Sequence, residues 1–249
     1  LLILFSPKRS GISILFQSLY LFFTSLLLDN VFLTKFNCMN LFKAYHEVFQ
    51  PALGDFNRDQ SPNNLYQPMQ YLLDLGGKRI RPFLTLMAGE GFGVSVKDAL
   101  GAAMAVEVFH NFTLMHDDIM DSAILRRGKT TVHEKWDVNT AILSGDAMLI
   151  KAYQCLDNYP SDIFQKLTHL LSKTAIEVCE GQQYDLDFET SSSVSQEDYI
   201  EMIRLKTAVL VGCALKMGAI IGKASPHDQE VIYDFGIQPQ HLLRLFFQL

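Results

Sequence analysis

The stretch DALGAAMAVEVFHNFTLMHDDIMD, from Asp98 to Asp121, decides the fold class of this chain. It contains no proline, and Ala, Met, Val and Phe recur so densely that apolar side chains cover most faces of a helix. Such a helix is typical of the centre of a bundle, because a helix at the surface keeps one polar face. The stretch therefore predicts a buried central helix that ends in a group of aspartates.

From residue 40 onward, apolar residues recur at three- and four-residue spacing, which indicates further helices. Gly76-Gly77 ends the first of them, Pro82 suits the first turn of the next, and Ser195 opens a start that resembles a capping box. No segment sustains the two-residue alternation of a strand. The predicted class is all-α, a helical bundle, with helices expected at residues 65–75, about 82–92, 98–121, 139–156, 161–188 and 195–222.

The acidic end of the central helix is a candidate metal site. Asp117 and Asp121 are four residues apart, so a helix places both carboxylates on one face. Like charges repel there, and the negative end of the helix dipole makes the position still less favourable. A hard cation removes this cost, and Mg²⁺ prefers oxygen ligands and also binds substrate phosphates. A solvated acidic helix end is the alternative, but the strongly apolar turns before it favour magnesium.

Basic groups lie on both sides of this acidic motif. GGKRIRP at residues 76–82 combines a glycine turn with a helix N-terminus, which favours anions. RRGK at residues 126–129 adds two guanidinium groups suited to phosphate oxygens. His110 falls near the same helical stripe as Asp117, and we expect it to donate a hydrogen bond to a phosphate beside the metal. Its alternative is a core histidine, and each basic cluster alone could be a solvated surface.

Taken in order, these motifs resemble those of the polyprenyl diphosphate synthases, which are trans-prenyltransferases. The longer matches are GGKRIRP at 76–82, HNFTLMHDDIMD at 110–121 and LRRGKTTVH at 125–133. The shorter ones are Gly145-Asp146, GQQYD at 181–185 and Lys206-Thr207. The resemblance spans residues 64–237, and the acidic motif followed by two arginines is its specific part.

The resemblance implies the isoprenoid synthase fold, in which mostly antiparallel helices surround a deep apolar cavity. It implies that isopentenyl diphosphate is condensed with an allylic prenyl diphosphate in isoprenoid biosynthesis, with Mg²⁺ as cofactor. By position, the metal would be held by Asp117 and Asp121, with Asp118 in support. Isopentenyl diphosphate would be bound by Lys78, Arg81, His110 and Arg127, and the allylic diphosphate by Arg126. The reacting centre would be lined by Lys206, Thr207 and Gln182.

The resemblance also suggests a product length. Phe112 lies five residues before Asp117, about one and a half helical turns below the metal site. In the family that the chain resembles, a large residue at this position forms the floor of the cavity and stops elongation of the product. Phe112 beside the small Thr113 most resembles enzymes that make geranylgeranyl diphosphate, with farnesyl diphosphate next. The alternative is that Phe112 is ordinary core packing.

The chain departs from the family pattern at its end. A second aspartate-rich motif is expected soon after Asp234-Phe235-Gly236, but residues 238–249 contain no acidic residue and Pro239 interrupts the expected helix. We therefore expect residues 39–237 to form the prenyltransferase domain, incomplete at its C-terminus, and residues 238–249 to be an aberrant tail. Little or no synthase activity is expected of the chain as it stands.

Residues 1–38 form an apolar extension that we expect to lie outside the fold. Residues 12–28 carry no charge, which is at the short limit for a membrane span, so membrane contact depends on that segment. The net charge of −6 argues against a nucleic-acid partner. The four scattered cysteines predict reduced thiols in a cytoplasmic protein. The resemblance implies a homodimer.

Three other functions stay open on the sequence alone. The chain could be a non-catalytic partner subunit or fragment of such a synthase, because the second acidic motif is missing. It could be a metal-dependent phosphohydrolase built on His116-Asp117, with His133 and His169 as further ligands. It could also be a membrane protein anchored by residues 12–28. Magnesium-dependent turnover, phosphate release without carbon–carbon bond formation, and membrane fractionation would separate these functions.

Overall fold

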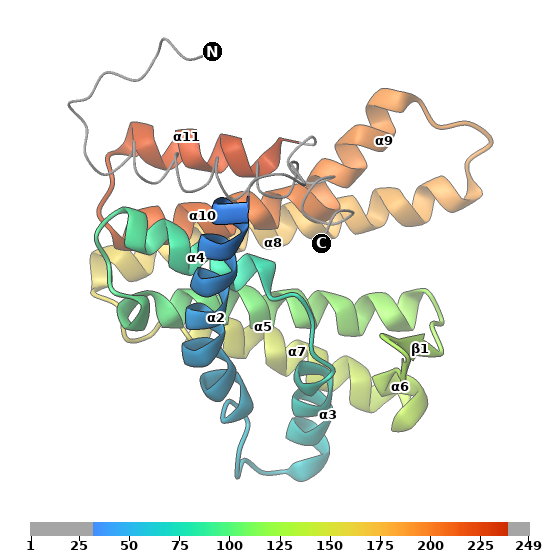
Figure 1. The fold of residues 1–249 in the computed structure, drawn as a ribbon. Coiled ribbons are helices and arrows are strands. Elements are labelled where there is room, and N and C mark those ends of the chain that lie inside the picture. The colour runs from blue at the N-terminus through green and yellow to red at the C-terminus, as the bar shows by residue number, and fades with distance from the viewer. Residues whose placement is uncertain (1–31, 239–249) are drawn as a thin grey trace.

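A computed structural model describes residues 32–238 of the chain, with side chains from residue 41 onward (Figure 1). The described chain is almost wholly helical, which confirms the all-α class. The helices are α2 (Phe32–Gly54), α3 (Asn63–Asp74), α4 (Ile80–Gly91), α5 (Val96–Met120), α6 (Val132–Lys135), α7 (Val138–Gln154), α8 (Ser161–Thr190), α9 (Gln196–Ile203), α10 (Val209–Ile221) and α11 (Pro226–Ile237). A π-helical segment, η1 (Arg204–Ala208), joins α9 to α10.

Helix α5 is the predicted central helix and runs through the middle of the bundle (Figure 1). It packs against α4 and α7 most extensively, and also against α10. Helix α10 in turn packs against α4, α8 and α11, so α5 and α10 are the two helices around which the others are arranged. Ser95 begins α5 by accepting a hydrogen bond from the backbone N–H of Asp98 at 3.1 Å, which satisfies one of the unpaired donors of the first turn.

The predicted helix at residues 195–222 is wrong as a single α-helix. It begins as expected, because the Ser195 side chain accepts a hydrogen bond from the Asp198 N–H at 3.0 Å. It then passes through η1, where the hydrogen-bond ladder widens by one residue before α10 begins. Residue periodicity does not detect such a bulge, because the apolar residues continue through it into α10, which is buried on nearly every side.

A small hairpin interrupts the helices after α5. Its strands are β1 (Leu125–Arg126) and β2 (Lys129–Thr130), and Leu125 pairs with Thr130 in antiparallel register. Gly128 and Arg127 form the turn, both with positive φ. Two-residue strands are too short to show alternation, so the sequence analysis did not predict them.

Several predictions concerned the two ends of the chain. Helix α2 begins at Phe32, within the N-terminal region that was predicted to lie outside the fold. Residues 12–28, and the proposed tail except Gln238, lie outside the described residues. Among helices of the described chain, none combines the length and apolar character needed to cross a bilayer.

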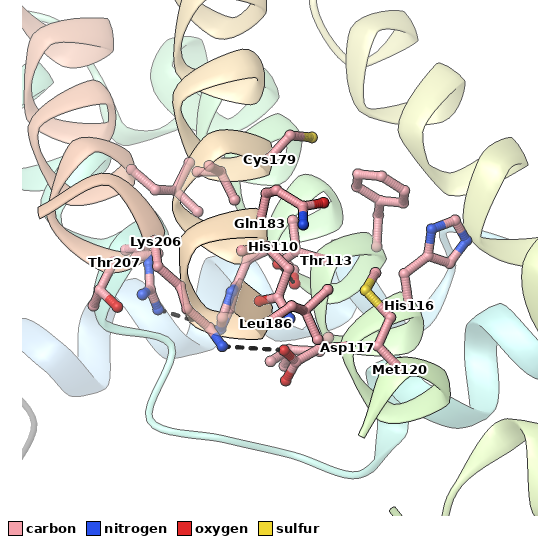
Figure 2. A pocket seen from close by; sticks show the side chains of 16 residues that line it. His110, Thr113, His116, Asp117, Met120, Cys179, Gln183, Leu186, Lys206 and Thr207 are labelled. Atoms are coloured by element: carbon pink, nitrogen blue, oxygen red, sulfur yellow. Dashed lines mark hydrogen bonds and ion pairs between the residues drawn. The ribbon is translucent and has the colours of Figure 1, made fainter. Parts of the chain in front are cut away.

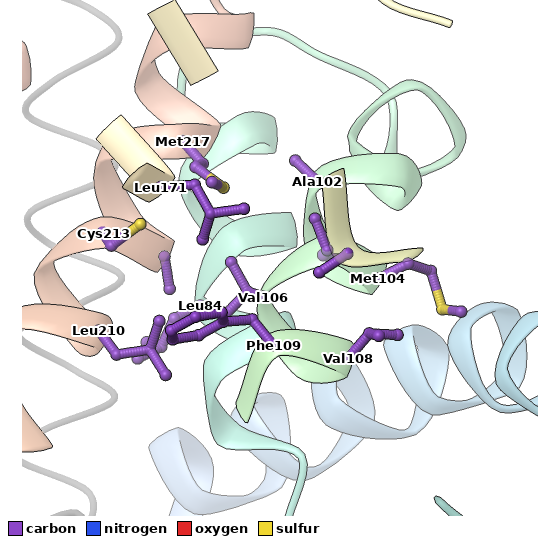
Figure 3. Packing of buried hydrophobic residues seen from close by; sticks show 14 of the residues in the cluster. Leu84, Ala102, Met104, Val106, Val108, Phe109, Leu171, Leu210, Cys213 and Met217 are labelled. Atoms are coloured by element: carbon purple, nitrogen blue, oxygen red, sulfur yellow. The ribbon is translucent and has the colours of Figure 1, made fainter. Parts of the chain in front are cut away.

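The hydrophobic core forms where α4, α5, α8 and α10 pack together. Figure 3 shows Leu84, Phe109, Leu171 and Leu210 converging from these four helices, and each is buried. Cys213 lies in the same core as a free thiol, and burial raises its pKa to about 12. Cys155 and Cys179 are also free.

The contact between α4 and α10 depends on a glycine. A Cβ at Gly218 would lie 2.5 Å from the carbonyl oxygen of Thr85 and 2.6 Å from the backbone nitrogen of Gly89. Both atoms belong to the α4 backbone, so neither can rotate away. The two helices approach as closely as they do because position 218 has no side chain.

We expect Gly218→Ala to destabilise the protein by about 1–3 kcal/mol, because α4 and α10 must move apart. Chemical unfolding followed by circular dichroism measures the change. Gly54→Ala is the matched control, since a Cβ there meets nothing within 4 Å among the described atoms. Equal stability of the two variants would contradict the close packing of α4 on α10.

Candidate active site

A cavity of about 290 Å³ opens between α5, α8 and η1 (Figure 2). Apolar side chains make up much of its wall, including Phe112, Leu114, Met120, Val178, Leu186 and Leu210. Of the predicted site residues, it brings together Arg81, His110, Phe112, Thr113, Asp117, Gln182, Lys206 and Thr207. Lys78, Asp118, Asp121, Arg126 and Arg127 are not part of its wall.

The acidic end of α5 lies at one side of this cavity. Asp117 lines it, and Asp121 is the C-cap residue one turn further on. Within the described chain, Asp117 Oδ1 is buried without a hydrogen bond and lies 3.4 Å from Lys206 Nζ. Burial, and then the charge of Asp117, raise the pKa of Asp121 above its usual value. The two carboxylates therefore repel each other, and a cation between them would relieve the repulsion.

Asp118 differs from its two neighbours. Its side chain is buried, and both oxygens accept hydrogen bonds of 2.8 Å from Arg126 Nε. Arg126 Nη2 also lies 3.3 Å from Asp117 Oδ2. Asp118 thus orients Arg126 beside the acidic motif, and its oxygens are already occupied. A part for Asp118 in supporting the metal stays a prediction.

Lys206 joins three elements at the cavity. It extends from η1 to Asp117 on α5, as Figure 2 shows, and donates a 2.5 Å hydrogen bond to Asp185 Oδ2 on α8. Burial alone would lower the pKa of Lys206, but the bond to Asp185 and the charge of Asp117 raise it. The ammonium group therefore stays charged between the two carboxylates. Asp185 had no assigned role in the sequence analysis, although it belongs to the GQQYD match.

The π-helical segment reaches the cavity through a close contact of backbones. A Cβ at Gly181 of α8 would lie 2.7 Å from both Leu205 C and Lys206 Cα, so only glycine allows η1 to pack there. This approach places Thr207 and Lys206 opposite Gln182 in the cavity wall. Gln182 Nε2 is buried and has no hydrogen-bond partner in the described chain. A buried polar group without a partner beside a cavity is suited to a hydrogen bond with a bound molecule.

Arg81 and His110 form a pair deeper in the wall. Arg81 Nη1 lies 3.2 Å from His110 Nε2. Because a guanidinium group can only donate, Nε2 is the acceptor and the ring proton is on Nδ1. Burial, and then the charge of Arg81, hold the pKa of His110 well below its usual value, so the ring is neutral. The phosphate contact predicted for His110 would have to come from Nδ1.

The basic turn before α4 contacts the arginines after α5. Arg127 Nη1 donates to the carbonyl oxygen of Gly76, and Lys78 is exposed. A Cβ at Gly77 would lie 2.9 Å from Arg127 Nη1, so the second glycine gives the guanidinium room. The two basic clusters therefore contact each other through Gly76 and Arg127, which are 51 residues apart in sequence, and Arg126 lies beside Asp117 at the acidic end of α5.

His116 does not act with Asp117 in the way that a phosphohydrolase would need. Its Nε2 lies 3.2 Å from the Ile142 carbonyl oxygen on α7, and its ring packs edge-on against Phe112 at 4.9 Å. A Cβ at Gly145 would overlap the ring. Among the described side chains, no three His, Cys, Asp or Glu residues are grouped as metal ligands. His116 packs between α5 and α7 and also lines the cavity.

A sequence model of the family described as polyprenyl synthetase matches residues 62–249. The chain belongs to the polyprenyl synthetase family. Over 178 residues it is 46% identical to the geranylgeranyl diphosphate synthase of Methanosarcina mazei, covering 70% of this chain and 55% of that protein. Members of this family are prenyltransferases, and the named relatives do not support the phosphohydrolase alternative.

Solved structures agree with this assignment. A geranylgeranyl pyrophosphate synthase is 59% identical with a TM-score of 0.77, over 79% of this chain and 60% of that one. A polyprenyl synthase from Caulobacter crescentus, in complex with calcium and isoprenyl diphosphate, is 28% identical with a TM-score of 0.72, over 80% of this chain and 59% of that one. The isoprenoid synthase fold is therefore confirmed. The chain spans little more than half the length of these relatives.

We expect Asp121→Asn to raise the melting temperature of the metal-free protein at neutral pH. A carboxyl whose pKa is raised on folding favours the protonated state, so its charge destabilises the fold above that pKa and has no effect below both pKa values. The gain should shrink as pH falls through the raised pKa. Mg²⁺ should stabilise the parent and not the variant.

Differential scanning fluorimetry across pH, with and without Mg²⁺, measures both effects. Asp157→Asn serves as the control, because Asp157 is exposed in the turn after α7, away from the acidic end of α5. If Mg²⁺ stabilises Asp121→Asn as much as the parent, Asp121 is not a ligand.

Proposed function

We propose that this chain is a magnesium-dependent prenyltransferase that condenses isopentenyl diphosphate with an allylic prenyl diphosphate. The observation that carries the proposal is an apolar cavity that has a pair of carboxylates at one side and, beside it, two basic clusters that contact each other. An allylic diphosphate needs all three, because its chain is apolar and its head group is anionic. The named relatives are synthases of prenyl diphosphates, which supports the same reaction.

The carboxylates fit a divalent cation. Asp117 Oδ1 is buried without a hydrogen bond in the described chain, and burial, then the charge of Asp117, raise the pKa of Asp121. Oxygen ligands of this kind suit Mg²⁺, and Asp117 and Asp121 would hold it, with Asp118 in support. When bound, the ion supplies positive charge for the leaving diphosphate. The calcium in the Caulobacter crescentus complex supports a divalent-cation site in this family.

The side chains of the chain itself account for the remaining steps. Arg126 and Lys206 lie beside Asp117, where they would stabilise the diphosphate as the allylic C–O bond breaks. Gln182 and Thr207 line the cavity, where their side-chain oxygen atoms would stabilise the allylic cation. The alkene of isopentenyl diphosphate then attacks the cation, and the departed diphosphate accepts the proton that is lost. Apolar walls exclude water that would quench the cation.

The second diphosphate would bind on the basic side. Arg81 and His110 in the cavity wall, with Lys78 and Arg127 at the Gly76 turn, form the proposed site for isopentenyl diphosphate. The two diphosphate groups would therefore bind at separate positions, and the carbon atoms that react would meet between them. A neutral His110 leaves Arg81 as the charge inside the wall.

We also propose a homodimer. Leu143 and Ile150 on α7 and Ile176 on α8 are 61%, 60% and 62% exposed, which is high for large apolar side chains. A second copy that covers them would remove this surface from water. Sedimentation at the mass of one chain would contradict the proposal. A cytoplasmic location stays a prediction from the cysteine content.

Asp117→Ala should cut prenyl transfer by more than about a hundredfold, through loss of charge stabilisation of the leaving group. Radiolabelled isopentenyl diphosphate incorporation measures this in the purified chain, and in a version continued with the C-terminal region of a homologous synthase. Asp157→Ala, at the exposed aspartate in the turn after α7, is the control. A near-normal rate in Asp117→Ala would sink the metal assignment. Diphosphate binding without turnover in both versions would favour the non-catalytic alternative.

Phe112→Ala should lengthen the product, if Phe112 is the floor that we propose. Its ring lines the cavity and is held between Phe109 and His116, at centroid distances of 5.6 and 4.9 Å. Removing the ring enlarges the cavity at this point, and Thr113 beside it is already small. Mass spectrometry of products from the active version gives the length distribution. A distribution unchanged from the parent would show that Phe112 is core packing and that elongation stops elsewhere.

A further inference from the structure

A buried ion pair lies directly beneath the basic turn. Arg79 Nη1 donates to Glu107 Oε1, and the two side chains are only 2% and 4% exposed. Arg79 Nη2 also donates to the carbonyl oxygen of Leu73, at the end of α3. Asn111 Nδ2 donates to Glu107 Oε1 at 3.0 Å and to its carbonyl oxygen at 2.8 Å. The pair therefore ties α3, the start of α4 and the middle of α5 together.

The backbone at this pair is in an unusual conformation. Arg79 is the N-cap of α4 with φ of 50°, in the left-handed region that side chains seldom adopt. Gly76 and Gly77 just before it also have positive φ, of 79° and 138°. Two glycines adopt such angles readily, but an arginine is held there only when its surroundings fix it. The contacts with Glu107 and Leu73 supply that fixation.

The pair also lies next to the side chains that face the anion. Lys78 precedes Arg79, and Arg81 follows it by two residues on the first turn of α4. Glu107 precedes His110 by three residues on α5, and His110 contacts Arg81 at 3.2 Å. Burial lowers the pKa of Arg81 to about 10, and the charge of Glu107 opposes that shift. Glu107 is thus the buried carboxylate beneath a group of cations.

We propose that Glu107 and Arg79 are positioning residues, which lock the 76–82 turn so that Lys78, Arg81 and Arg127 converge on one diphosphate. Neither side chain touches the cavity, and both are sealed from solvent. Arg127 holds the turn from outside through Gly76, and Glu107 holds it from inside through Arg79. The proposal rests on the proposed function, because it assigns the turn to the binding of a diphosphate.

Charge and position make opposite predictions for Glu107. If this carboxylate acts only through its charge, Glu107→Gln removes a negative group near an anion site and diphosphate binds more tightly. If it positions the turn, Glu107→Gln leaves Arg79 buried without its partner, the turn loosens, and binding weakens. Arg79→Lys is complementary, since it keeps the positive charge but cannot donate to Glu107 and Leu73 in fork geometry.

The test is calorimetric titration of the full chain with inorganic diphosphate in the presence of a chelator. Without divalent cations, the aspartates at the end of α5 repel the anion and the basic turn is the binding site. Glu107→Gln and Arg79→Lys should each weaken binding by about tenfold or more. Ile220→Ala is the control, because it removes a buried side chain at the far end of α10. It should lower the melting temperature and leave diphosphate affinity unchanged.

Folding of the single variants is checked by the Arg79→Met/Glu107→Met double variant, which replaces the ion pair by apolar side chains of similar length and avoids an unpaired buried charge. It should remain folded and still bind diphosphate about tenfold more weakly. Affinity within twofold of the parent in the folded variants, or tighter binding by Glu107→Gln, would overturn the positioning proposal alone. A parent chain that does not bind diphosphate at all would overturn the substrate assignment, and the positioning proposal with it.

Discussion

From Ala102 to Phe109, α5 is enclosed by other helices, and side chains on every face of it are fully or almost fully buried. A helix in that position has no water to satisfy a polar group, so each polar residue must find its partner in a neighbouring helix. Glu107 finds Arg79, and Arg79 brings the start of α4 with it. Only where α5 leaves the core, at Asp117, can carboxylates meet a solvated ligand. Because α5 is enclosed over part of its length, the charge of Glu107 has a structural role, whereas the aspartates at the exposed end of the same helix are the ones proposed to bind a ligand.

The same separation explains the charges around the cavity. Asp117 and Asp121 repel each other, and Lys206 and Arg126 partly offset that repulsion in the chain without metal. Lys206 is shared with Asp185, and the two carboxylates keep its ammonium group charged at the acidic end of α5. In the proposed function, an anion bound together with a divalent cation would meet charges of both signs already in place. This is preorganisation, since the cost of assembling the charges is met during folding.

Much of this arrangement was predictable from the sequence, and the parts that were not share a physical cause. The 98–121 helix and the carboxylate pair follow from a period of 3.6 residues, and the structure has α5 at Val96–Met120. Glu107, by contrast, sits in an apolar run where periodicity marks it only as buried, and its partner is 28 residues away. The sequence analysis gave Asp118 only a supporting part beside Asp117 and Asp121, and its contact with Arg126, eight residues further on, was not predicted. Contacts between residues distant in sequence, and the π-helical segment at Lys206, arise from the packing of helices on one another. A local sequence pattern therefore does not predict them.

Glycine sets the width of the cavity on both sides of α5. At Gly181 the backbone of α8 meets that of η1, which brings Lys206 and Thr207 to Gln182. At Gly145 the backbone of α7 meets the His116 ring, which holds Phe112 against the cavity wall. A methyl group at either position would move a whole helix, because the atoms that it meets are backbone or a wedged ring. The glycines of GQQYD and of Gly145-Asp146 are thus spacers, and the polar residues next to them in those motifs depend on the distances that the glycines set.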